Sequence, residues 1–354
     1  MITVVGAGNI GRAIVDYLSD DFDVSVIDIS EKALKNLRGV KKFKGKVKDH
    51  ADLVKRSEII ITALPGSASF ETISSIIKMG KSVVDVSYME EDPFLLDNVA
   101  RENRVFLIPD AGFAPGLSNV LSGYLYKKID GIKKIEIYVG GLPRERIPPL
   151  DYAVTWSVEG LIDEYTRPAR IIKNYKIKTV DPLESVEPFC ISNIGTFETF
   201  ISDGLRTMLK TFKIRDMFER TLRYPSHIEK IKLLRDLGFF SKDKINGCSP
   251  YEVTISLFER LRIDVEDMSI LLVRGHGKRV EDLFIYDRYD EKSGITSMAR
   301  MTGYTAASVA TIALEMDEYG VVPPEYFGMD GEYFLKLREK LRKKGIIINE
   351  TLNL

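Results

Sequence analysis

Three glycines near the N-terminus are spaced in a way that permits phosphate binding. Gly6, Gly8 and Gly11 belong to the segment GAGNIG, which directly follows an apolar run and opens a helical pattern. The first glycine of such a segment permits a tight turn, the second lets the backbone approach a pyrophosphate, and the third allows close helix packing. The helix N-terminus adds unpaired N–H groups that attract phosphate. We therefore expect a dinucleotide to bind Gly6, Gly8, Asn9, Ile10 and Gly11.

An acidic residue, Asp28, ends the second apolar run, about 20 residues after the glycines. At this place a carboxylate accepts hydrogen bonds from the adenosine ribose and repels a 2′-phosphate, so the sequence predicts NAD rather than NADP. Lys32 lies nearby and weakens this preference without reversing it. The alternative for Asp28 is a helix cap or a turn residue.

Two further turns follow later apolar runs of the same region. Their residues are Leu64, Pro65 and Gly66 in one turn, and Asp85, Ser87 and Tyr88 in the other. Ligands of open parallel sheets bind beyond the carboxyl ends of the strands, so we expect both turns to face the nicotinamide half of the cofactor. Taken alone, Pro65-Gly66 is an ordinary turn.

The segment DAGFAPG at 110–116 begins with another carboxylate at the end of an apolar run. A carboxylate beside a nicotinamide can orient or deprotonate an amine, so Asp110 is a candidate catalytic residue. The alternative is a loop and helix start, in which Pro115 and Gly116 set the turn.

Three polar turns in the second half of the chain carry arginines. They are EYTRPAR at 164–170, SDGLR at 202–206 and TLRYPSH at 221–227. Because arginine binds carboxylates with two hydrogen bonds, these turns suggest a substrate that has a carboxylate. The alternative for Arg167, Arg170, Arg206 and Arg223 is that each forms an ion pair at the surface. Asp203 is a candidate acceptor for a substrate ammonium group.

Histidine and cysteine are scarce. The three histidines, His50, His227 and His276, are not spaced as zinc ligands, and we expect no metal. His50 opens a helix, and His276 lies in a predicted hairpin turn. His227 is in a polar turn, where a structural and a catalytic role are equally consistent with the sequence. With Asp110 and Tyr88, it completes the set of candidate bases.

The elements that must position these residues show two different patterns along the sequence. Apolar strand patterns at 2–5, 24–27, 58–63, 82–86 and 105–108 alternate with helical patterns at 10–18, 31–37, 51–55, 69–79 and 93–101. This alternation predicts a Rossmann-type α/β domain with a doubly wound parallel sheet. The basic stretch 41–48 is expected to be a solvated strand edge.

After Gly116 the strand patterns at 134–139, 153–156, 170–172 and 268–273 lie closer together, which predicts a second, α+β domain with an antiparallel or mixed sheet. We expect the nucleotide domain to cover 1–117 and the substrate and dimerisation domain 118–354. A small-residue helix at 297–316 is predicted to pack back on the first domain, and a further helix at 331–344.

The composition limits the classes of molecule that the chain is expected to bind. The chain has 354 residues, with 51 basic and 52 acidic side chains and a net charge of -1. This balance argues against nucleic-acid and membrane-surface binding. No apolar run is long enough for a transmembrane helix, and no secretory signal is recognisable. Cys190 and Cys248 are far apart, which favours reduced thiols and a cytoplasmic protein.

Taken together, the motifs resemble the saccharopine dehydrogenase family, and most closely its short archaeal and bacterial L-lysine 6-dehydrogenases. The resemblance extends to about residue 328. The segments that carry it are VVGAGNIG at 4–11, ALPG at 63–66, VDVSYM at 84–89, DAGFAPGLSN at 110–119, YVGGLP at 138–143, EYTRPAR at 164–170, FISDGLR at 200–206 and TLRYPSH at 221–227.

The resemblance implies hydride transfer between a nicotinamide cofactor and a C–N bond of lysine or of a lysine-derived compound. It also implies a homodimer, a place for Ser87-Tyr88 beside substrate and nicotinamide, and Arg223 as the carboxylate anchor. Saccharopine-forming relatives carry an acidic residue immediately before the matching Pro-Gly, whereas this chain has Ala114. That departure favours a simpler amine substrate.

The sequence thus predicts NAD-dependent oxidative deamination of L-lysine at its ε-carbon. The product would be 2-aminoadipate 6-semialdehyde, which cyclises to a piperideine carboxylate, and ammonia. One alternative is a reductase of the same family that joins an amino acid and an aldehyde into a secondary amine. The other is a non-catalytic NAD-binding protein, which a fold alone does not exclude.

Overall fold

The computed structural model describes residues 1–154, 157–263 and 265–350. The chain divides into two compact units. Unit 1 consists of Met1–Tyr124 and Ala299–Ile347, and unit 2 consists of Leu125–Met298 with the residues from Ile348 onward. The boundaries fall inside two helices, α6 (Leu117–Lys128) and α11 (Ser297–Ala313).

Unit 1 is built on a seven-stranded parallel sheet with the order β15-β6-β5-β4-β1-β2-β3. Its strands are β1 (Ile2–Val5), β2 (Val24–Asp28), β3 (Lys41–Lys44), β4 (Ile59–Thr62), β5 (Val83–Asp85), β6 (Phe106–Ile108) and β15 (Gly320–Val321). The central strands are fully buried, as their continuous apolar runs predict. The lysine-rich β3 forms one edge, which confirms the expected solvated strand.

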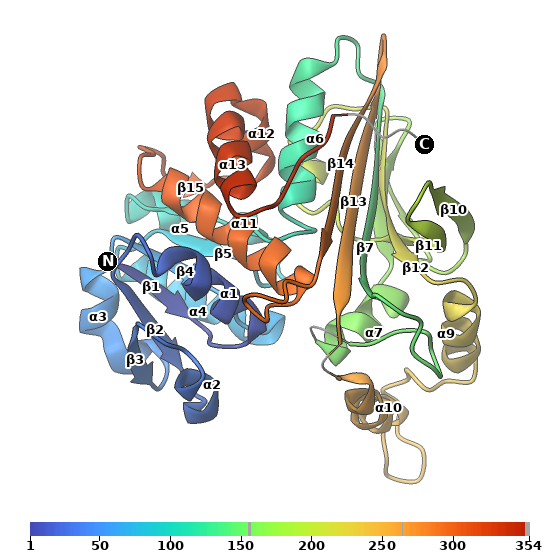
Figure 1. Cartoon of the computed structure of the whole chain (residues 1–354), viewed down its shortest axis with the longest axis horizontal. Helices are drawn as coiled ribbons and strands as arrows, with labels where there is room; N and C mark the ends of the chain where they lie inside the picture. Colours follow the sequence, from blue (N-terminus) through green and yellow to red (C-terminus); the bar gives the residue numbers. More distant parts are fainter. Residues whose placement is uncertain (155–156, 264, 351–354) are drawn as a thin grey trace. The chain divides into compact units, whose positions relative to one another are not determined.

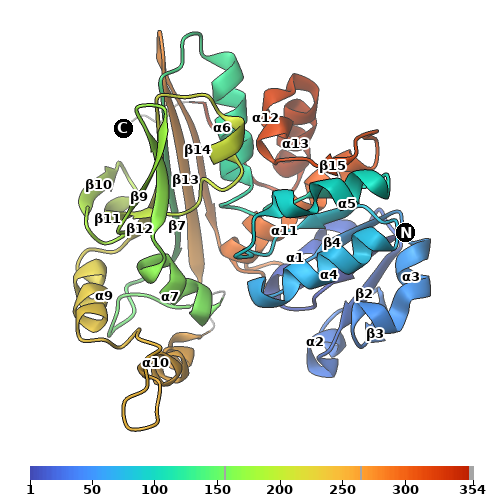
Figure 2. The same ribbon diagram turned by 180° about the vertical axis from the view of Figure 1, so that it is seen from behind.

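Helices cover both faces of this sheet. They are α1 (Asn9–Leu18), α2 (Glu31–Lys35), α3 (Ala51–Arg56), α4 (Gly66–Lys78), α5 (Asp97–Glu102), α12 (Glu325–Met329) and α13 (Gly331–Lys343), with α6 and α11. Figures 1 and 2 show α1 and α11 on one face and α4 and α5 on the other. The predicted doubly wound α/β fold is confirmed. From β1 the chain adds β2 and β3 on one side of the sheet and then β4, β5 and β6 on the other. The turn after β1 therefore lies at the switch point where such sheets bind ligands.

Helix α11 packs directly on α1. A Cβ atom added at Gly303 would come within 2.7 Å of the Ala13 Cβ, so the two helices approach closely. At the next position Tyr304 donates a hydrogen bond to Asp16. The small residues of α11 thus serve close packing inside unit 1.

Unit 2 contains a mixed sheet with the order β10-β11-β12-β7-β13-β14, which β8 and β9 extend from β12. The strands are β7 (Lys134–Pro143), β8 (Ala169–Lys173), β9 (Lys176–Val180), β10 (Glu187–Ile191), β11 (Gly195–Ser202), β12 (Asp216–Arg223), β13 (Asp267–His276) and β14 (Val280–Arg288). Only β12 and β7 are parallel among these pairs. The expected mixed α+β second domain is confirmed.

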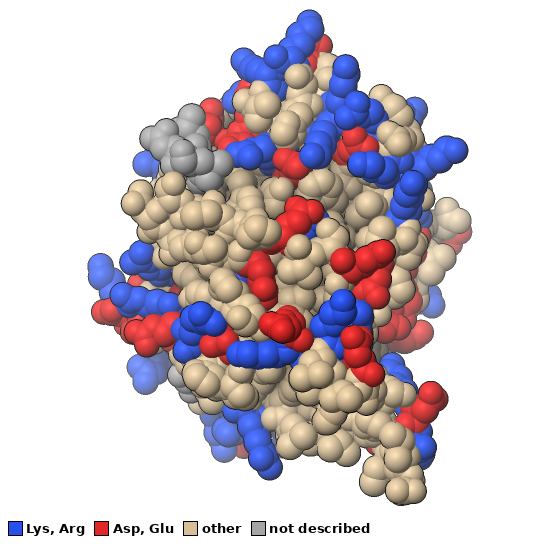
Figure 3. All heavy atoms as spheres, turned by 90° about the vertical axis from the view of Figure 1, so that its right-hand side faces the viewer, with Lys and Arg blue, Asp and Glu red and all other residues tan. Residues whose placement is uncertain are grey.

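The helices of unit 2 are α7 (Val158–Thr166), α8 (Met208–Thr211), α9 (His227–Asp236) and α10 (Pro250–Phe258). Side chains from α7, α9 and α10 join those of β12 and β13 in one apolar core. On the face of the molecule that Figure 3 shows, basic and acidic side chains lie interspersed. None of the helices in the described ranges is long and apolar enough to cross a membrane.

Three local expectations differ from the structure. A strand is expected at 153–156, but Ala153 and Val154 lie outside any strand, and 155–156 fall outside the described residues. His276 is not in a turn. It ends β13, where its Nε2 lies 2.7 Å from Glu136 Oε2 across the β13–β7 pair, because the strand pairing extends further than its apolar part. The short strand β15 is not predicted at all, since Gly320-Val321 has no periodicity to detect.

Candidate functional site

The glycine turn of unit 1 has the geometry that a pyrophosphate requires. Gly6 has a φ of 109°, and a Cβ atom there would lie 2.3 Å from the Ala63 carbonyl oxygen. A Cβ atom at Gly11 would lie 1.9 Å from the Gly6 carbonyl oxygen, so the start of α1 packs against the turn itself. At Gly8 nothing lies within 4 Å of the same position, so its backbone is open to a ligand. These three positions fit the roles of a dinucleotide-binding turn.

The N-terminus of α1 is not closed by a side chain. Gly8 is the N-cap residue, and no side-chain hydrogen bond caps the helix. The first-turn N–H groups and the positive end of the helix dipole are therefore available to a phosphate group.

Asp28 ends β2 and is tied to the glycine turn. Its Oδ2 accepts a hydrogen bond from the Ala7 N–H at 2.6 Å, and its Oδ1 accepts one from the Ser30 N–H at 2.6 Å. The carboxylate is thus held in place by two backbone groups, with further lone pairs for a ribose.

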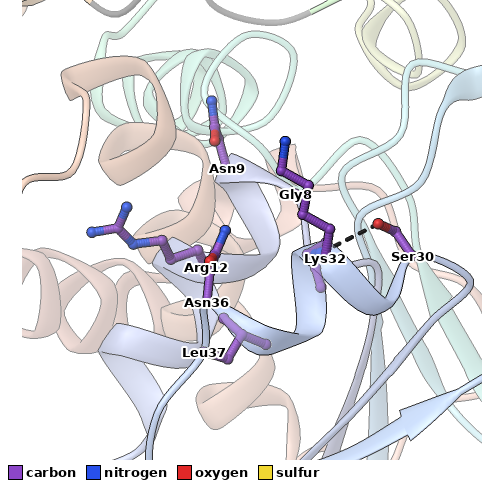
Figure 4. Close-up of a pocket in the computed structure, with 9 residues that line it drawn as sticks. Gly8, Asn9, Arg12, Ser30, Lys32, Asn36 and Leu37 are labelled. Atoms are coloured by element: carbon purple, nitrogen blue, oxygen red, sulfur yellow. Dashed lines mark hydrogen bonds between the residues drawn. The ribbon is translucent and has the colours of Figure 1, made fainter.

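A pocket of about 300 Å³ opens beside this carboxylate. It is lined by Ala7, Gly8, Asn9, Arg12, Ser30, Lys32, Ala33, Asn36 and Leu37 (Figure 4). Two cations, Arg12 and Lys32, come from α1 and α2 and give the pocket a positive rim. Sequence reasoning noted Lys32 but missed Arg12, although its place one helical turn after Gly8 was the available signal.

The two predicted nicotinamide turns are joined by Asp85. Thr62 Oγ1 donates to Asp85 Oδ1 at 2.6 Å, and Ser87 Oγ donates to the same oxygen at 2.8 Å. The Ser87 N–H donates to Oδ2 at 3.1 Å. Ser87 Oγ in turn accepts a hydrogen bond from the Leu64 N–H at 3.3 Å. Asp85 is fully buried, and both of its carboxyl oxygens are engaged in these hydrogen bonds, so the carboxyl holds the two turns together.

Close backbone contact reinforces this junction. A Cβ atom at Gly66 would lie 2.3 Å from the Tyr88 carbonyl oxygen, so only glycine lets the two turns meet. Pro65 precedes Gly66 as the N-cap residue of α4 and is exposed. Tyr88 itself is half-buried.

Two buried carboxyls stand at the ends of neighbouring strands. Asp85 ends β5, and Asp110 follows β6 with 1% exposure and a left-handed φ of 51°. Burial, with a smaller contribution from the charge of Asp110, raises the pKa of Asp85 to about 7. The Ala111 N–H donates to the Asp85 carbonyl oxygen, which fixes the backbone beside both groups.

In unit 2, Arg223 lies in the interior at 2% exposure. Its Nε donates to Tyr165 Oη at 3.0 Å, its Nη1 to the Leu222 carbonyl at 2.9 Å, and its Nη2 to Glu164 Oε2 at 2.5 Å. These bonds use three of the five guanidinium N–H donors. Glu164 and Tyr165 were missed by sequence reasoning, although the predicted turn 164–170 contained both.

His227 belongs to the same network. Its Nε2 lies 2.8 Å from Tyr165 Oη, and its Nδ1 lies 2.7 Å from the Leu150 carbonyl oxygen. Since a carbonyl only accepts, Nδ1 carries the proton, and Nε2 accepts from the tyrosine. Burial, followed by the charge of Arg223, lowers the pKa of His227 to about 3. The histidine is neutral with both nitrogens engaged, so its geometry supports a structural role, and its catalytic role stays a prediction.

Two of the predicted substrate ligands bind each other. Arg170 donates to Asp203 from its backbone N–H and Nε at 2.9 Å and from its Nη2 at 2.8 Å. Arg206 is buried with a left-handed φ of 48° in the turn after β11. The structure thus brings Arg170 and Asp203 together as a bidentate ion pair, and their contacts with a substrate stay predictions.

The candidate residues are therefore distributed over both units. The nucleotide turn, Asp28, Tyr88 and Asp110 belong to unit 1, whereas Arg170, Asp203, Arg206, Arg223 and His227 belong to unit 2. Among the residues that the structure describes, no group of three or more His, Cys, Asp or Glu side chains is placed to hold a metal ion.

Two family models together match almost the whole chain. The saccharopine dehydrogenase NADP binding domain matches residues 2–108, and the saccharopine dehydrogenase C-terminal domain matches residues 112–346. The first of these matches identifies a nicotinamide-nucleotide-binding domain, and the second covers all of the arginine-bearing turns.

Individual relatives are more distant. The chain is 24% identical over 263 residues to the NADP-dependent, L-glutamate-forming saccharopine dehydrogenase of Pyricularia oryzae, covering 69% of this chain and 58% of the relative. The saccharopine dehydrogenase of Saccharomyces cerevisiae is 24% identical over 266 residues, with 68% and 59% covered. The chain therefore spans about three fifths of the length of these fungal enzymes.

Two solved structures share the fold. An apo saccharopine dehydrogenase (L-Glu forming) from Saccharomyces cerevisiae superposes with a TM-score of 0.80 at 19% identity, covering 99% of each chain. A homospermidine synthase from Legionella pneumophila in complex with NAD gives a TM-score of 0.68 at 15% identity, covering 99% of this chain and 91% of the other.

Proposed function

Because this chain belongs to the saccharopine dehydrogenase family, we propose that it is a nicotinamide-nucleotide-dependent dehydrogenase that oxidises L-lysine at its ε-carbon. The observation that carries the proposal is the Asp110 carboxyl, which follows β6 and stands beside the Asp85 junction that holds the turns of Ser87 and Tyr88. Open parallel sheets bind the reacting parts of their ligands at this edge. The ammonium group of an amine substrate must lose a proton before hydride departs, and a carboxylate at this edge can hold the group and accept that proton.

When bound, the nicotinamide ring supplies the hydride acceptor. The ε-ammonium group of lysine has no lone pair, so it must first lose a proton to a base. Hydride then leaves the ε-carbon as the nitrogen lone pair forms a C=N bond. Water adds to this imine, ammonia departs, and 2-aminoadipate 6-semialdehyde remains, whose α-amine can close on the aldehyde with loss of water.

The residues of this chain have distinct tasks in that sequence. We assign proton removal to Asp110, with Tyr88 as the alternative. The two donors of Arg223 that are not used by Tyr165, Leu222 and Glu164 are assigned to the α-carboxylate of the substrate. Asp85 orients the turns that carry Ser87 and Tyr88.

For the cofactor we propose NAD over NADP. Asp28 is held at the end of β2 by two backbone N–H groups, in the position where a carboxylate repels a 2′-phosphate. Arg12 and Lys32 in the adjoining pocket favour the opposite choice, as does the NADP binding domain that matches residues 2–108. The ratio of kcat/KM for the two cofactors measures which effect is larger.

The test is formation of NADH from NAD and a panel of amines, followed by trapping of a cyclic imine product. Oxidation of L-lysine is expected, and absence of NADH formation from lysine would overturn the proposal. A second candidate is a reductase that joins an amine and an aldehyde, which the similarity to a saccharopine dehydrogenase and to a homospermidine synthase favours. It requires amine, aldehyde and reduced cofactor together. A homodimer in the cytoplasm, expected from the sequence, is tested by sedimentation and fractionation.

A further inference from the structure

We propose that Glu219 accepts the α-ammonium group of the amino-acid substrate, an inference that rests on the proposed function. Glu219 lies on β12, four positions before Arg223. Because side chains alternate along a strand, Glu219, Thr221 and Arg223 share one face of the sheet. The β11–β12 register places Ser202 opposite Glu219 and Phe200 opposite Thr221, so these two side chains lie on the same face.

The carboxyl of Glu219 is only partly satisfied. Ser202 Oγ donates to its Oε1 at 2.9 Å, whereas its Oε2 has no hydrogen-bond partner within the ranges that the structure describes. The residue is 3% exposed. A Cβ atom at Gly204 would come within 1.8 Å of Oε1 and 2.3 Å of Oε2, so the carboxyl points at a position where only glycine fits. A buried carboxyl oxygen without a partner is costly, and a ligand that donates to it recovers that free energy.

Glu219 differs in this respect from the two other carboxylates of the cluster. Glu164 is bonded to Arg223, and Asp203 is bonded to Arg170. Both already have a cationic partner, whereas Glu219 has only a hydroxyl. Burial raises the pKa of Glu219 to about 8, and the charges of Glu164 and Asp203 contribute in the same direction. A cation beside Glu219 would restore the ionised form.

Arg223 lies on the same face of β12 as this carboxyl. Its guanidinium carbon lies 5.6 Å from the centre of the Phe200 ring, and Phe200 sits opposite Thr221, between Arg223 and Glu219 along the strand. Glu164 is bonded to Arg223 and acts electrostatically on Glu219 as well. A cationic and an anionic group therefore lie on one face of β12. This is the arrangement that recognises the carboxylate and the ammonium of a single amino acid.

The test compares L-lysine with 6-aminohexanoate, which has the same carboxylate and reacting amine but no α-ammonium group. Oxidation of each compound is assayed with the wild-type chain and with the Glu219→Gln variant, using NAD at saturating concentration. Glutamine has the same shape without the charge, and Glu187→Gln, at a carboxylate bonded to Arg220, is the matched control. Circular dichroism of each variant verifies folding.

We expect the wild-type preference for lysine over 6-aminohexanoate, measured as kcat/KM, to fall about 10- to 100-fold in Glu219→Gln and to stay unchanged in Glu187→Gln. An equal fall in kcat/KM for both substrates, or an unchanged preference for lysine, would overturn the inference. If the wild-type chain oxidises neither compound, the proposed function fails on its own. In that case, both compounds are titrated calorimetrically into wild-type and Glu219→Gln protein with NAD. The inference predicts that the wild-type chain binds lysine more tightly than 6-aminohexanoate and that the variant does not.

Discussion

Replacing Asp85 by asparagine should change the stability of the chain in a pH-dependent way. The folded chain holds the pKa of this carboxyl at about 7, well above its ordinary value of 3.8, because the group is fully buried. A raised pKa in the folded state means that the proton stabilises folding. This contribution is complete below about pH 4 and is lost as the pH rises toward 7. Asparagine does not titrate, so the free energy of unfolding of the variant does not fall in this pH range for the same reason.

The size of the effect follows from the shift. Each pKa unit corresponds to about 1.4 kcal/mol, and most of the change between pH 5 and pH 8 occurs below the folded pKa. The free energy of unfolding of Asp85→Asn should therefore rise relative to wild type by about 3 kcal/mol over this interval. A constant cost of about 1–3 kcal/mol is superimposed, since the amide Nδ2 faces the Ser87 N–H where Oδ2 accepted a hydrogen bond. The variant should thus be less stable at pH 5 and close to wild type or better at pH 8.

Urea unfolding followed by circular dichroism at pH 5, 6, 7 and 8 provides the measurement. Thr62→Val is the matched control, because it removes a donor that favours the ionised form of Asp85. Its cost should increase with pH, opposite in slope to that of Asp85→Asn. The charge of Asp110 also acts on Asp85, so Asp110→Asn should lower the pKa of Asp85 and reduce the pH dependence of wild-type stability. A difference between Asp85→Asn and wild type that is the same at pH 5 and pH 8 would refute this reasoning.

Four other predictions concern three further site residues. Asp28→Ser should raise the ratio of kcat/KM with NADP to that with NAD by about 10- to 100-fold, because Arg12 and Lys32 stay in the pocket; an unchanged ratio would contradict the assignment of Asp28. His227→Asn should leave the acid limb of the kcat/KM pH profile in place, since the pKa of His227 is lowered to about 3 and the ring is neutral at working pH; disappearance of the limb would instead identify His227 as the base. The lowered pKa also means that wild-type stability falls as the pH drops below about 6.5, because the unfolded chain then takes up the proton, and His227→Asn should remove that slope in acid unfolding experiments. Arg223→Met should destabilise unit 2 by about 3–5 kcal/mol by leaving Glu164 without its ion-pair partner, and adding Glu164→Gln should recover part of the loss in thermal unfolding; additive effects would show that the pair does not couple.

The parts of the fold that depend on local pattern could be predicted from the sequence. The buried strands of unit 1 are continuous apolar runs, and the glycine turn depends on three residues within one short segment. Asp28 could be placed because the end of β2 is fixed by the same βαβ unit. In each case the determining interactions lie close together in the sequence.

The parts that depend on pairing between distant segments could not be predicted from the sequence. Arg170 and Asp203 each looked like a substrate ligand, but they are 33 positions apart and neutralise each other. His227 lay in a polar turn, yet its partners Tyr165 and Leu150 come from segments 62 and 77 positions away. Glu219 was not considered, because its burial and its single partner are visible only once β11 and β12 are paired.

Unit 1 is built from two separate segments of the chain, and this affects how it folds during synthesis. Unit 1 needs Ala299–Ile347 to complete its sheet and to cover α1, yet these residues follow about 170 others that form most of unit 2. At ribosomal speeds of about 5–20 residues per second, the N-terminal segment of unit 1 waits roughly 10–35 s for its remaining strand and helices. During this time β6 is a sheet edge without its neighbour β15, and α1 lacks its cover from α11. Chaperone dependence during synthesis should therefore concentrate on this interval, and truncation after unit 2 should yield aggregation rather than a nucleotide-binding fragment.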